Sequence, residues 1–311
     1  MKPEILMPGP MLPSCMEALD DAFTVHKLWQ AADADAFLAE VAPRVRGVAT
    51  ARGCPGALMR RLPKLEIVAS FGVGYDSVDV ATAQELGVRV TNTPDVLNDA
   101  VAELTVGMMV ALCRRISQAE AYLRAGKWET DGPFPLTNQL TGSTVGIFGL
   151  GRIGKEIARR LEAMRMTVVY HGRREQPDQP YRYYADLAAM AADVDWLVVI
   201  APASAETEGA VSAEVINALG PKGALVNVAR GALVDEPALI AALQEGRLGA
   251  AALDVFADEP RVPKALKEMD NVLLIPHVGS ATRQTRWAMG DVVVRNLKAH
   301  FEGRPLISPV V

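Results

Sequence analysis

The sequence predicts an α/β protein built from two doubly wound parallel-sheet domains. Short apolar runs alternate with stretches of helical spacing along most of the 311 residues. Such alternation is typical of parallel strands joined by helices that cover both faces of a sheet. A long helical segment, residues 98–124, and a loop rich in glycine, proline and polar residues, 126–142, interrupt the series once. The chain is long enough for two domains, and we expect the second to start near residue 100.

The first series predicts five strands and four helices within the first hundred residues. The helical stretches are MLPSCMEALDDA, ADAFLAEVA, GALMRRL and DVATAQEL, which carry apolar residues at helical spacing. The expected strands are EILM at 4, FTVHKL at 23, RVRGVA at 44, LEIVASFG at 65 and VRVTN at 88.

The second series predicts six strands, and helical stretches follow each of the first four. These strands are STVGIFGLG, MTVVYHG, WLVVIAP, KGALVNVAR, GAAALDVF and NVLLIPH. A last helix, about 283–301, follows the sixth strand, and we expect it to return to the first domain. The expected domains are therefore residues 1–97 with 282–311, and residues 98–281.

Composition narrows the function classes. Half of the residues are apolar and 22% are charged, as in soluble globular proteins. The net charge of −5 argues against nucleic acid and anionic membrane as partners. We expect a cytoplasmic protein, because no apolar run has signal-peptide or membrane-spanning character. The three cysteines form no CxxC pair and the four histidines do not cluster, which predicts reduced, buried thiols and no metal site.

A glycine-rich turn predicts a dinucleotide site. The segment GLGRIG fits G-x-G-x-x-G between the strand-like TVGIF and the helical RIGKEIARRLEAM. Its glycines permit a tight turn, close approach to a pyrophosphate and close helix–strand contact. The free N–H groups and dipole at the helix start favour the diphosphate. The alternative is a glycine turn without a ligand. The cofactor residues expected here are Gly149, Leu150, Gly151, Arg152, Ile153 and Gly154.

The end of the next strand predicts which dinucleotide binds. Many dinucleotide folds place an acid there to bind the ribose hydroxyls of NAD, but this chain has Gly172, Arg173 and Arg174. Glycine leaves room for a 2′-phosphate, and arginine binds phosphate through two parallel hydrogen bonds. The pattern therefore favours NADPH, with Arg173 closer to the strand end. The alternative is a solvated arginine pair on a loop.

Three polar residues each lie just beyond a predicted strand. Arg230 follows GALVNVA, Glu259 lies in DVFADEP, and His277 follows NVLLIP. Parallel sheets bind ligands at the carboxyl ends of their strands, so we expect these side chains in one cleft. Each also has an alternative of its own: Arg230 as an exposed arginine, Glu259 as a solvated acid and His277 as a capping residue.

Several long segments resemble the D-isomer-specific 2-hydroxyacid dehydrogenases, especially the NADPH-dependent glyoxylate, hydroxypyruvate and hydroxyphenylpyruvate reductase branch. They are VGIFGLGRIGKEIARRL, NVARGALVDEPALIAAL, GAAALDVFADEP and LIPHVGSAT, and the resemblance covers nearly the whole chain. It implies a Rossmann nucleotide-binding domain, a flavodoxin-like substrate domain and a homodimer paired through the nucleotide domain. It also implies that Arg230, Glu259 and His277 are catalytic.

The chemistry of a 2-oxo acid reduction suits these three residues. The carbonyl carbon takes a hydride from the nicotinamide and the carbonyl oxygen takes a proton. Free histidine titrates at about pH 6.5, so His277 can donate that proton. Glu259 would stabilise the charged ring and orient it. Arg230 would hold the substrate carboxylate or polarise its carbonyl.

The resemblance implies further contacts. SFGVGYDSVD resembles the family's carboxylate-binding loop, in which the amides of Val73 and Gly74 would bind the acid, although its glycines are also compatible with a simple turn. Asp254 matches a residue that contacts the nicotinamide carboxamide; the alternative is a helix cap. Arg52 would face the substrate or lie on a plain surface loop. The remaining cofactor residues expected are Ala201, Pro202, Thr207, Val228, Ala229, Gly279 and Ser280.

The sequence thus predicts an NADPH-dependent reductase of hydroxypyruvate, glyoxylate or a bulkier 2-oxo acid. One alternative is a nucleotide-sensing binding protein on the same fold, which the intact arginine, glutamate and histidine argue against. Another is a related dehydrogenase with a different substrate, such as phosphoglycerate or formate.

Overall fold

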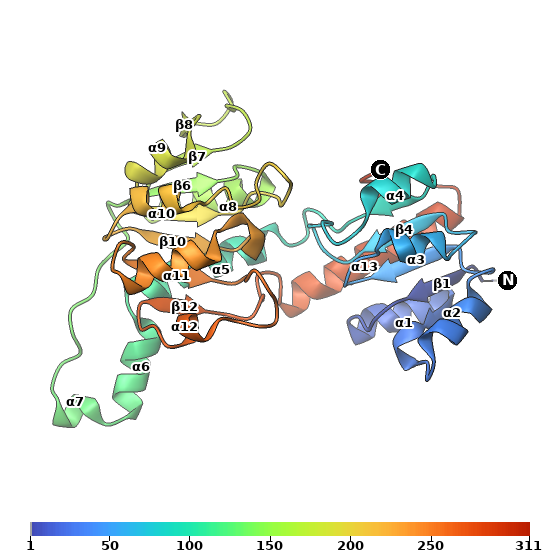
Figure 1. Cartoon of the computed structure of the whole chain (residues 1–311), viewed down its shortest axis with the longest axis horizontal. Helices are drawn as coiled ribbons and strands as arrows, with labels where there is room; N and C mark the ends of the chain where they lie inside the picture. Colours follow the sequence, from blue (N-terminus) through green and yellow to red (C-terminus); the bar gives the residue numbers. More distant parts are fainter. Residues whose placement is uncertain (1) are drawn as a thin grey trace. The chain divides into compact units, whose positions relative to one another are not determined.

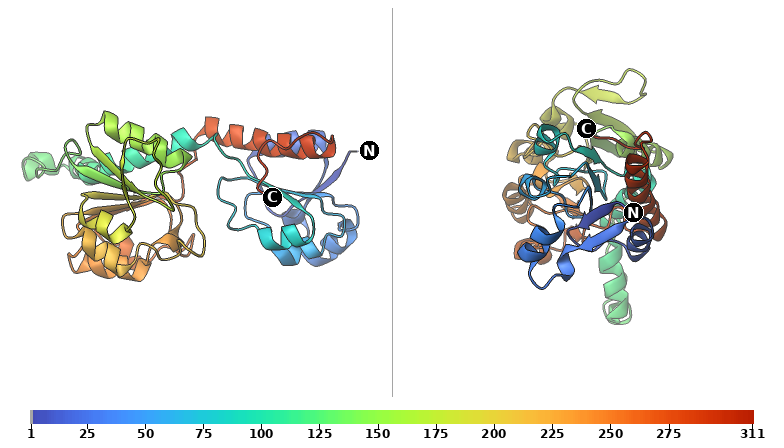
Figure 2. Two further views of the ribbon diagram at one scale, coloured as in Figure 1. Left: turned by 90° about the horizontal axis from the view of Figure 1, so that it is seen from above. Right: turned by 90° about the vertical axis from the view of Figure 1, so that its right-hand side faces the viewer.

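The computed structural model describes residues 2–311, which form two compact units. One unit contains the chain up to Leu97 together with Ser280–Val311, and the other contains Asn98–Gly279. Each unit has its own parallel sheet with helices on both faces (Figures 1 and 2). The predicted α/β class with two parallel sheets is confirmed.

The first unit is built on a five-stranded sheet in the order β2-β1-β3-β4-β5. This is a doubly wound order, in which the order of the strands reverses between β1 and β3 while all strands stay parallel. Ligands bind such sheets at the carboxyl ends of the strands. Every predicted strand is present, β1 with the predicted bounds and the other four in a shorter form. The strands are β1 (Glu4–Met7), β2 (Thr24–Lys27), β3 (Gly47–Thr50), β4 (Ile67–Ser70) and β5 (Arg89–Thr91).

Helices of the first unit cover both faces of this sheet. The last helix, α13, packs against α1 and β4, because Val293, Val294 and Leu297 lie in one apolar cluster with Ile5 and Ile67. This helix therefore does return to the first unit. The helices are α1 (Pro13–Ala22), η1 (Leu28–Gln30), α2 (Ala34–Val41), α3 (Gly56–Arg60), α4 (Val80–Glu85) and α13 (Arg283–Phe301).

The second unit is built on a seven-stranded sheet in the order β12-β11-β10-β9-β6-β7-β8. The strand order reverses between β6 and β9, which places the switch point of a nucleotide-binding sheet beside the glycine-rich turn. The strands are β6 (Thr144–Phe148), β7 (Thr167–His171), β8 (Arg182–Tyr184), β9 (Trp196–Val199), β10 (Ala224–Asn227), β11 (Ala250–Leu253) and β12 (Val272–Leu274). The helices are α5 (Asn98–Cys113), α6 (Ile116–Arg124), α7 (Lys127–Thr130), α8 (Arg152–Ala163), α9 (Leu187–Ala192), α10 (Ala213–Leu219), η2 (Gly231–Leu233), α11 (Glu236–Gln244) and α12 (Lys264–Lys267).

The structure differs from the predicted elements in several places. The long helix expected over 98–124 is broken between α5 and α6, because Arg115 has a left-handed φ of 49° that no right-handed helix accommodates. The loop expected after it contains the short α7. The sequence also did not predict β8 and α12, which have three and four residues and are too short for a periodic pattern.

The predicted buried thiols are confirmed. Cys15, Cys54 and Cys113 are all free and buried. Burial raises the pKa of the Cys15 thiol to about 11 and that of Cys54 to about 12, so both stay protonated and unreactive. Among the described helices, none has the length and apolarity to cross a membrane.

Candidate active site

The glycine-rich turn joins β6 to α8, and two of its glycines are required by sterics. Gly149 has a left-handed φ of 108°, and a Cβ there would lie 2.6 Å from the backbone of Ala201. A Cβ at Gly154 would lie 2.2 Å from the carbonyl oxygen of Gly149. Gly151 has no such neighbour within 4 Å, so its backbone faces open space at the start of α8. This is the arrangement that lets a pyrophosphate approach the helix N-terminus.

Of the other residues of this turn, Leu150 lies two residues before α8, and Arg152 and Ile153 are the first two residues of the helix. Leu150 is buried, and its carbonyl accepts a hydrogen bond of 2.8 Å from the side-chain amide of Gln176. Gln176 is in turn held by a 2.7 Å bond from its backbone N–H to the Tyr170 hydroxyl. Gln176 was not predicted, although it ties the loop after β7 to the glycine-rich turn.

The loop after β7 carries the predicted arginine pair. Gly172 follows the last residue of β7, and a Cβ there would meet nothing within 4 Å. Arg173 and Arg174 are both exposed. The end of β7 therefore presents two cations and free space, with no carboxylate in the position after the strand.

The segment after β9 lies against the glycine-rich turn. Ala201 is the residue whose backbone excludes a Cβ at Gly149. Within the turn that follows, the Thr207 hydroxyl donates to the Pro202 carbonyl at 2.7 Å and accepts from the Ser204 N–H at 2.9 Å. Thr207 thus holds the shape of a turn that borders the predicted cofactor site.

His277 and Glu259 form an ion-pair contact at the carboxyl end of the sheet. The Nδ1 atom of His277 lies 2.7 Å from Glu259 Oε2, and Glu259 Oε1 accepts a 3.1 Å bond from the Phe256 N–H. A carboxylate only accepts, so Nδ1 carries a proton, and Nε2 is the atom left for proton exchange. The His277 side chain is 47% exposed, which makes its ring accessible to a substrate.

Asp254 fixes the backbone that carries His277. It is 1% exposed, and its two carboxylate oxygens accept from the N–H groups of Val278 at 2.6 Å and Gly279 at 2.9 Å. Its own carbonyl accepts from the His277 N–H at 2.8 Å. Burial raises the pKa of Asp254, while these backbone bonds act in the opposite direction. The alternative of a helix cap was wrong, because both oxygens bind the turn after His277.

Arg230 is the third residue after β10, and Asn227 and Gly231 determine the local geometry. Asn227 is 1% exposed and donates from its side chain to the Arg230 carbonyl at 2.9 Å. A Cβ at Gly231 would lie 2.0 Å from the carbonyl carbon of Phe256, so the Arg230 segment lies directly against the loop that carries Glu259. Neither Asn227 nor Gly231 was predicted. The signal for Asn227 was a polar residue at the end of the apolar run ALVN.

The other predicted cofactor residues lie in the segments that follow β10 and β12. Val228 and Ala229 follow β10 and are buried, and the Ala229 N–H donates to the Asn227 side chain at 3.1 Å. Gly279 is the last residue of the second unit, and Ser280 is the first residue of the C-terminal part of the other unit.

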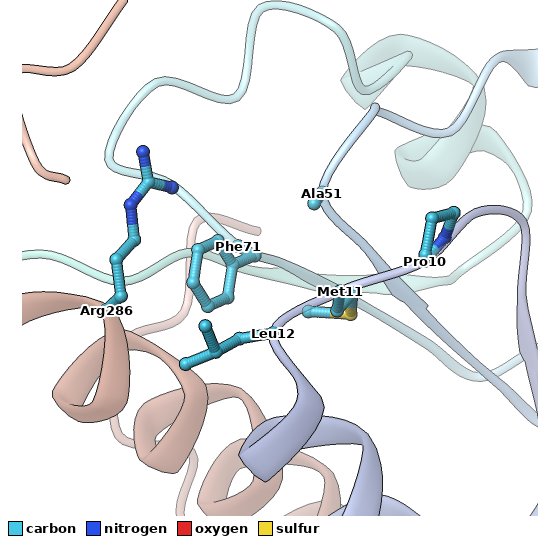
Figure 3. A pocket seen from close by; sticks show the side chains of 6 residues that line it. All are labelled: Pro10, Met11, Leu12, Ala51, Phe71 and Arg286. Atoms are coloured by element: carbon cyan, nitrogen blue, oxygen red, sulfur yellow. The ribbon is translucent and has the colours of Figure 1, made fainter. Parts of the chain in front are cut away.

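In the first unit, the predicted substrate residues follow β3 and β4. Val73 and Gly74 are half-buried, and Arg52 is exposed. A pocket of about 330 Å³ lies at the same edge of the sheet (Figure 3). The Arg286 guanidinium lies 5.6 Å from the centre of the Phe71 ring. The pocket is lined by Pro10, Met11, Leu12, Ala51, Phe71 and Arg286.

Comparison with known proteins identifies the family. Residues 106–279 match the family described as D-isomer specific 2-hydroxyacid dehydrogenase, NAD binding domain. The chain is also 49% identical over 310 residues to hydroxyphenylpyruvate reductase of Plectranthus scutellarioides, covering 99% of this chain and 98% of that protein. The chain belongs to the D-isomer specific 2-hydroxyacid dehydrogenase family.

Other similar proteins of this family are 2-oxo acid reductases. Glyoxylate/hydroxypyruvate reductase A of Arabidopsis thaliana is 46% identical over 309 residues, covering 99% of this chain and 98% of that protein. The NADPH-dependent glyoxylate/hydroxypyruvate reductase of Sinorhizobium meliloti, solved with NADP and malonate, superposes with a TM-score of 0.94 at 46% identity, covering 100% of this chain and 97% of that one. The predicted family and its D-2-hydroxyacid dehydrogenase class are confirmed, and an NAD-binding domain is present.

Proposed function

We propose that this D-2-hydroxyacid dehydrogenase reduces a 2-oxo acid, such as hydroxypyruvate or glyoxylate, to the D-2-hydroxy acid with NADPH. The observation that carries the proposal is the His277–Glu259 pair, in which Nδ1 is bound to a carboxylate and Nε2 is left for a substrate. The similar proteins named above, a hydroxyphenylpyruvate reductase and a glyoxylate/hydroxypyruvate reductase, support the reaction class.

When bound, NADPH would supply the hydride that the carbonyl carbon takes. His277 donates a proton from Nε2 to the carbonyl oxygen, so that the C=O group becomes a secondary alcohol. Glu259 accepts the Nδ1 hydrogen bond, which keeps the ring oriented and stabilises its charged form before transfer. Arg230 stays charged throughout and polarises the carbonyl or holds the carboxylate.

The residues at the cofactor end fit NADPH. The open space at Gly151 admits a pyrophosphate, and the N–H groups at the start of α8 point toward it. The open space at Gly172 admits a 2′-phosphate, and the exposed Arg173 and Arg174 offer it positive charge. The NADP complex of the Sinorhizobium meliloti reductase supports this choice.

The substrate is proposed to lie with its carboxylate on the amides of Val73 and Gly74. Phe71 lies two residues earlier and lines the pocket of about 330 Å³, so the substrate side chain would enter that pocket (Figure 3). The walls of this pocket are mostly apolar, and its volume is larger than a hydrogen atom or a hydroxymethyl group would fill. This leaves room for a 2-oxo acid bulkier than hydroxypyruvate. Arg52 extends beside Gly9 at the same edge.

A homodimer is proposed to form through the arm of the second unit that contains α6 and α7. Figure 1 shows these helices extending away from the seven-stranded sheet, and neither has a buried residue. Of the eight large apolar side chains found exposed among residues 2–311, four lie on this arm: Ile116, Leu123, Trp128 and Leu136. A second copy of the chain would cover them, and sedimentation equilibrium that gives a monomer mass would refute this assembly.

The function is tested by replacing His277 with Ala and assaying glyoxylate, hydroxypyruvate and 4-hydroxyphenylpyruvate with NADPH and with NADH. Turnover is expected to fall by about 10²–10⁴-fold, because the proton donor is lost. NADPH affinity, measured by fluorescence, is expected to stay the same.

The matched control is His300→Ala, which removes another histidine paired with a glutamate. His300 lies on α13, and its Nε2 atom is 3.0 Å from Glu66 Oε2. Its turnover is expected to equal that of the wild type. Near-normal turnover of His277→Ala would show that the proton comes from another group. A wild-type chain that binds NADPH but reduces none of these acids would favour the nucleotide-sensing alternative.

A further inference from the structure

The loop after β4 has two carbonyl groups held by one neighbouring segment. The Gly72 carbonyl accepts from the Thr93 N–H at 2.8 Å, and the Val73 carbonyl accepts from the Asn92 side-chain amide at 2.9 Å. Asn92 and Thr93 follow the last residue of β5. Both carbonyls therefore point toward the end of β5.

This arrangement fixes the direction of two amide groups. The peptide bonds that follow Gly72 and Val73 are trans, so each N–H points opposite to the carbonyl of the same peptide unit. The N–H groups of Val73 and Gly74 consequently both point away from β5. Neither donates to a backbone carbonyl within the described residues 2–311. Two adjacent N–H groups directed to one side form an anion-binding concavity.

Asn92 is itself held from a distant part of the chain. Its carbonyl accepts from the Ser308 hydroxyl at 2.6 Å, and that hydroxyl accepts from the Asn296 side-chain amide at 2.9 Å. Asn296 lies on α13, is fully buried, and accepts the N–H groups of Ile307 and Ser308. A continuous series of hydrogen bonds thus runs from α13 through Ser308 and Asn92 to Val73.

We propose that Asn92 is a positioning residue that turns the Val73 and Gly74 amides toward the carboxylate of the 2-oxo acid. This inference rests on the proposed function. Asn92 does not touch the substrate; it holds the Val73 carbonyl so that the Gly74 N–H stays on the binding side. Ser308 holds Asn92 through a hydrogen bond to its backbone carbonyl, and Asn296 in turn holds Ser308. The effect is on binding of the carboxylate, which is the same group before and after reduction.

The test compares Asn92→Ala and Asn92→Leu with the wild type. Leucine keeps the side-chain volume without a donor, so agreement between the two variants separates the hydrogen bond from packing. The KM for hydroxypyruvate is expected to rise about tenfold, with kcat changed less than about threefold, because a contact equal in ground and transition states affects KM alone. Inhibition by oxamate, a carboxylate that is not reduced, is expected to weaken by the same factor, with NADPH affinity unchanged.

The matched control is Asn271→Ala. Asn271 also donates from its side chain to a backbone carbonyl, that of Gly249 at 3.0 Å, but at the amino end of β11 and β12. It is expected to leave KM unchanged. Ser308→Ala removes the hydrogen bond from the Ser308 hydroxyl to the Asn92 carbonyl. It is expected to raise KM by about twofold to threefold, because Asn92 is then held only in part.

If both Asn92 variants keep the wild-type KM and oxamate inhibition while only their thermal midpoint falls, Asn92 is merely structural and the proposal is wrong. If the Asn92 variants do not fold, an unchanged KM in Ser308→Ala has the same meaning. A wild-type chain that neither reduces hydroxypyruvate nor binds oxamate would instead refute the proposed function itself.

Discussion

Two loops of this protein occupy equivalent places in different sheets. The turn of residues 149–154 follows β6, and the loop of residues 71–74 follows β4, each at the carboxyl end of a parallel strand that is not at the edge of its sheet. Both contain glycines, and both are proposed to offer backbone N–H groups to an anion, a pyrophosphate in one case and a carboxylate in the other.

The loops reach this geometry in different ways. In the first, Gly149 and Gly154 leave no room for a Cβ, and α8 supplies the amides. In the second, Gly72 has no left-handed φ, and hydrogen bonds from Asn92 and Thr93 set the direction of the amides. One loop is shaped by the residue types within it, and the other by a segment about twenty residues away.

The largest expected effect is that of Gly154→Ala. Its Cβ would lie 2.2 Å from the Gly149 carbonyl oxygen, which is backbone and cannot move aside cheaply. We expect a loss of about 3 kcal/mol of stability, the upper range for overpacking, and a fall of roughly 6–12 °C in the thermal midpoint of the apo protein. Differential scanning calorimetry without cofactor measures both quantities.

Two other glycines provide controls for this variant. Gly107 lies inside α5 with nothing within 4 Å of a Cβ, so Gly107→Ala is expected to raise stability slightly, by about 0.4–1 kcal/mol. Gly151→Ala also meets open space and is expected to keep the apo midpoint, but to weaken NADPH by about tenfold or more. An unaltered midpoint in Gly154→Ala would show that sterics do not shape this turn.

The difference between the two loops explains why the sequence predicted the glycine-rich turn but not the residues that support the loop after β4. The glycine-rich turn was recognised from six consecutive residues between a strand and a helix, because its constraints are local. Arg230, Glu259 and His277 follow β10, β11 and β12, and the carboxyl ends of parallel strands share one edge of a sheet; their catalytic roles stay a prediction. The structure places these strands as neighbours in the order β12-β11-β10.

The supporting residues were not predicted, because their partners are distant in the sequence. Asn92 acts on a residue 19 positions earlier, and Ser308 acts on a residue 216 positions earlier. Nothing in a short window distinguishes such an asparagine from one in a turn. Arg115 shows the same limit, since a left-handed residue between two helical patterns has no signature in periodicity.

A second effect, smaller than that of Gly154→Ala, concerns the ligand of the first loop. Arg173→Asp is expected to weaken NADPH binding by roughly 2- to 30-fold relative to NADH binding, because an exposed attraction of about 0.2–1 kcal/mol becomes a repulsion of similar size. Titrations of both cofactors measure this preference. The difference is expected to shrink at high salt, since the guanidinium is exposed. An unchanged ratio would show that the 2′-phosphate does not lie beside Arg173.

The smallest expected effect belongs to the second loop. Gly72→Ala would place a Cβ 3.3 Å from the Gly74 carbonyl oxygen, a contact that a shift of a few tenths of an ångström relieves. We expect a change within about 0.5 kcal/mol in stability and less than about threefold in KM for hydroxypyruvate. Calorimetry and steady-state kinetics measure the two quantities. A loss as large as that of Gly154→Ala would contradict the comparison, because it would mean that sterics, and not the bonds from Asn92 and Thr93, shape this loop as well.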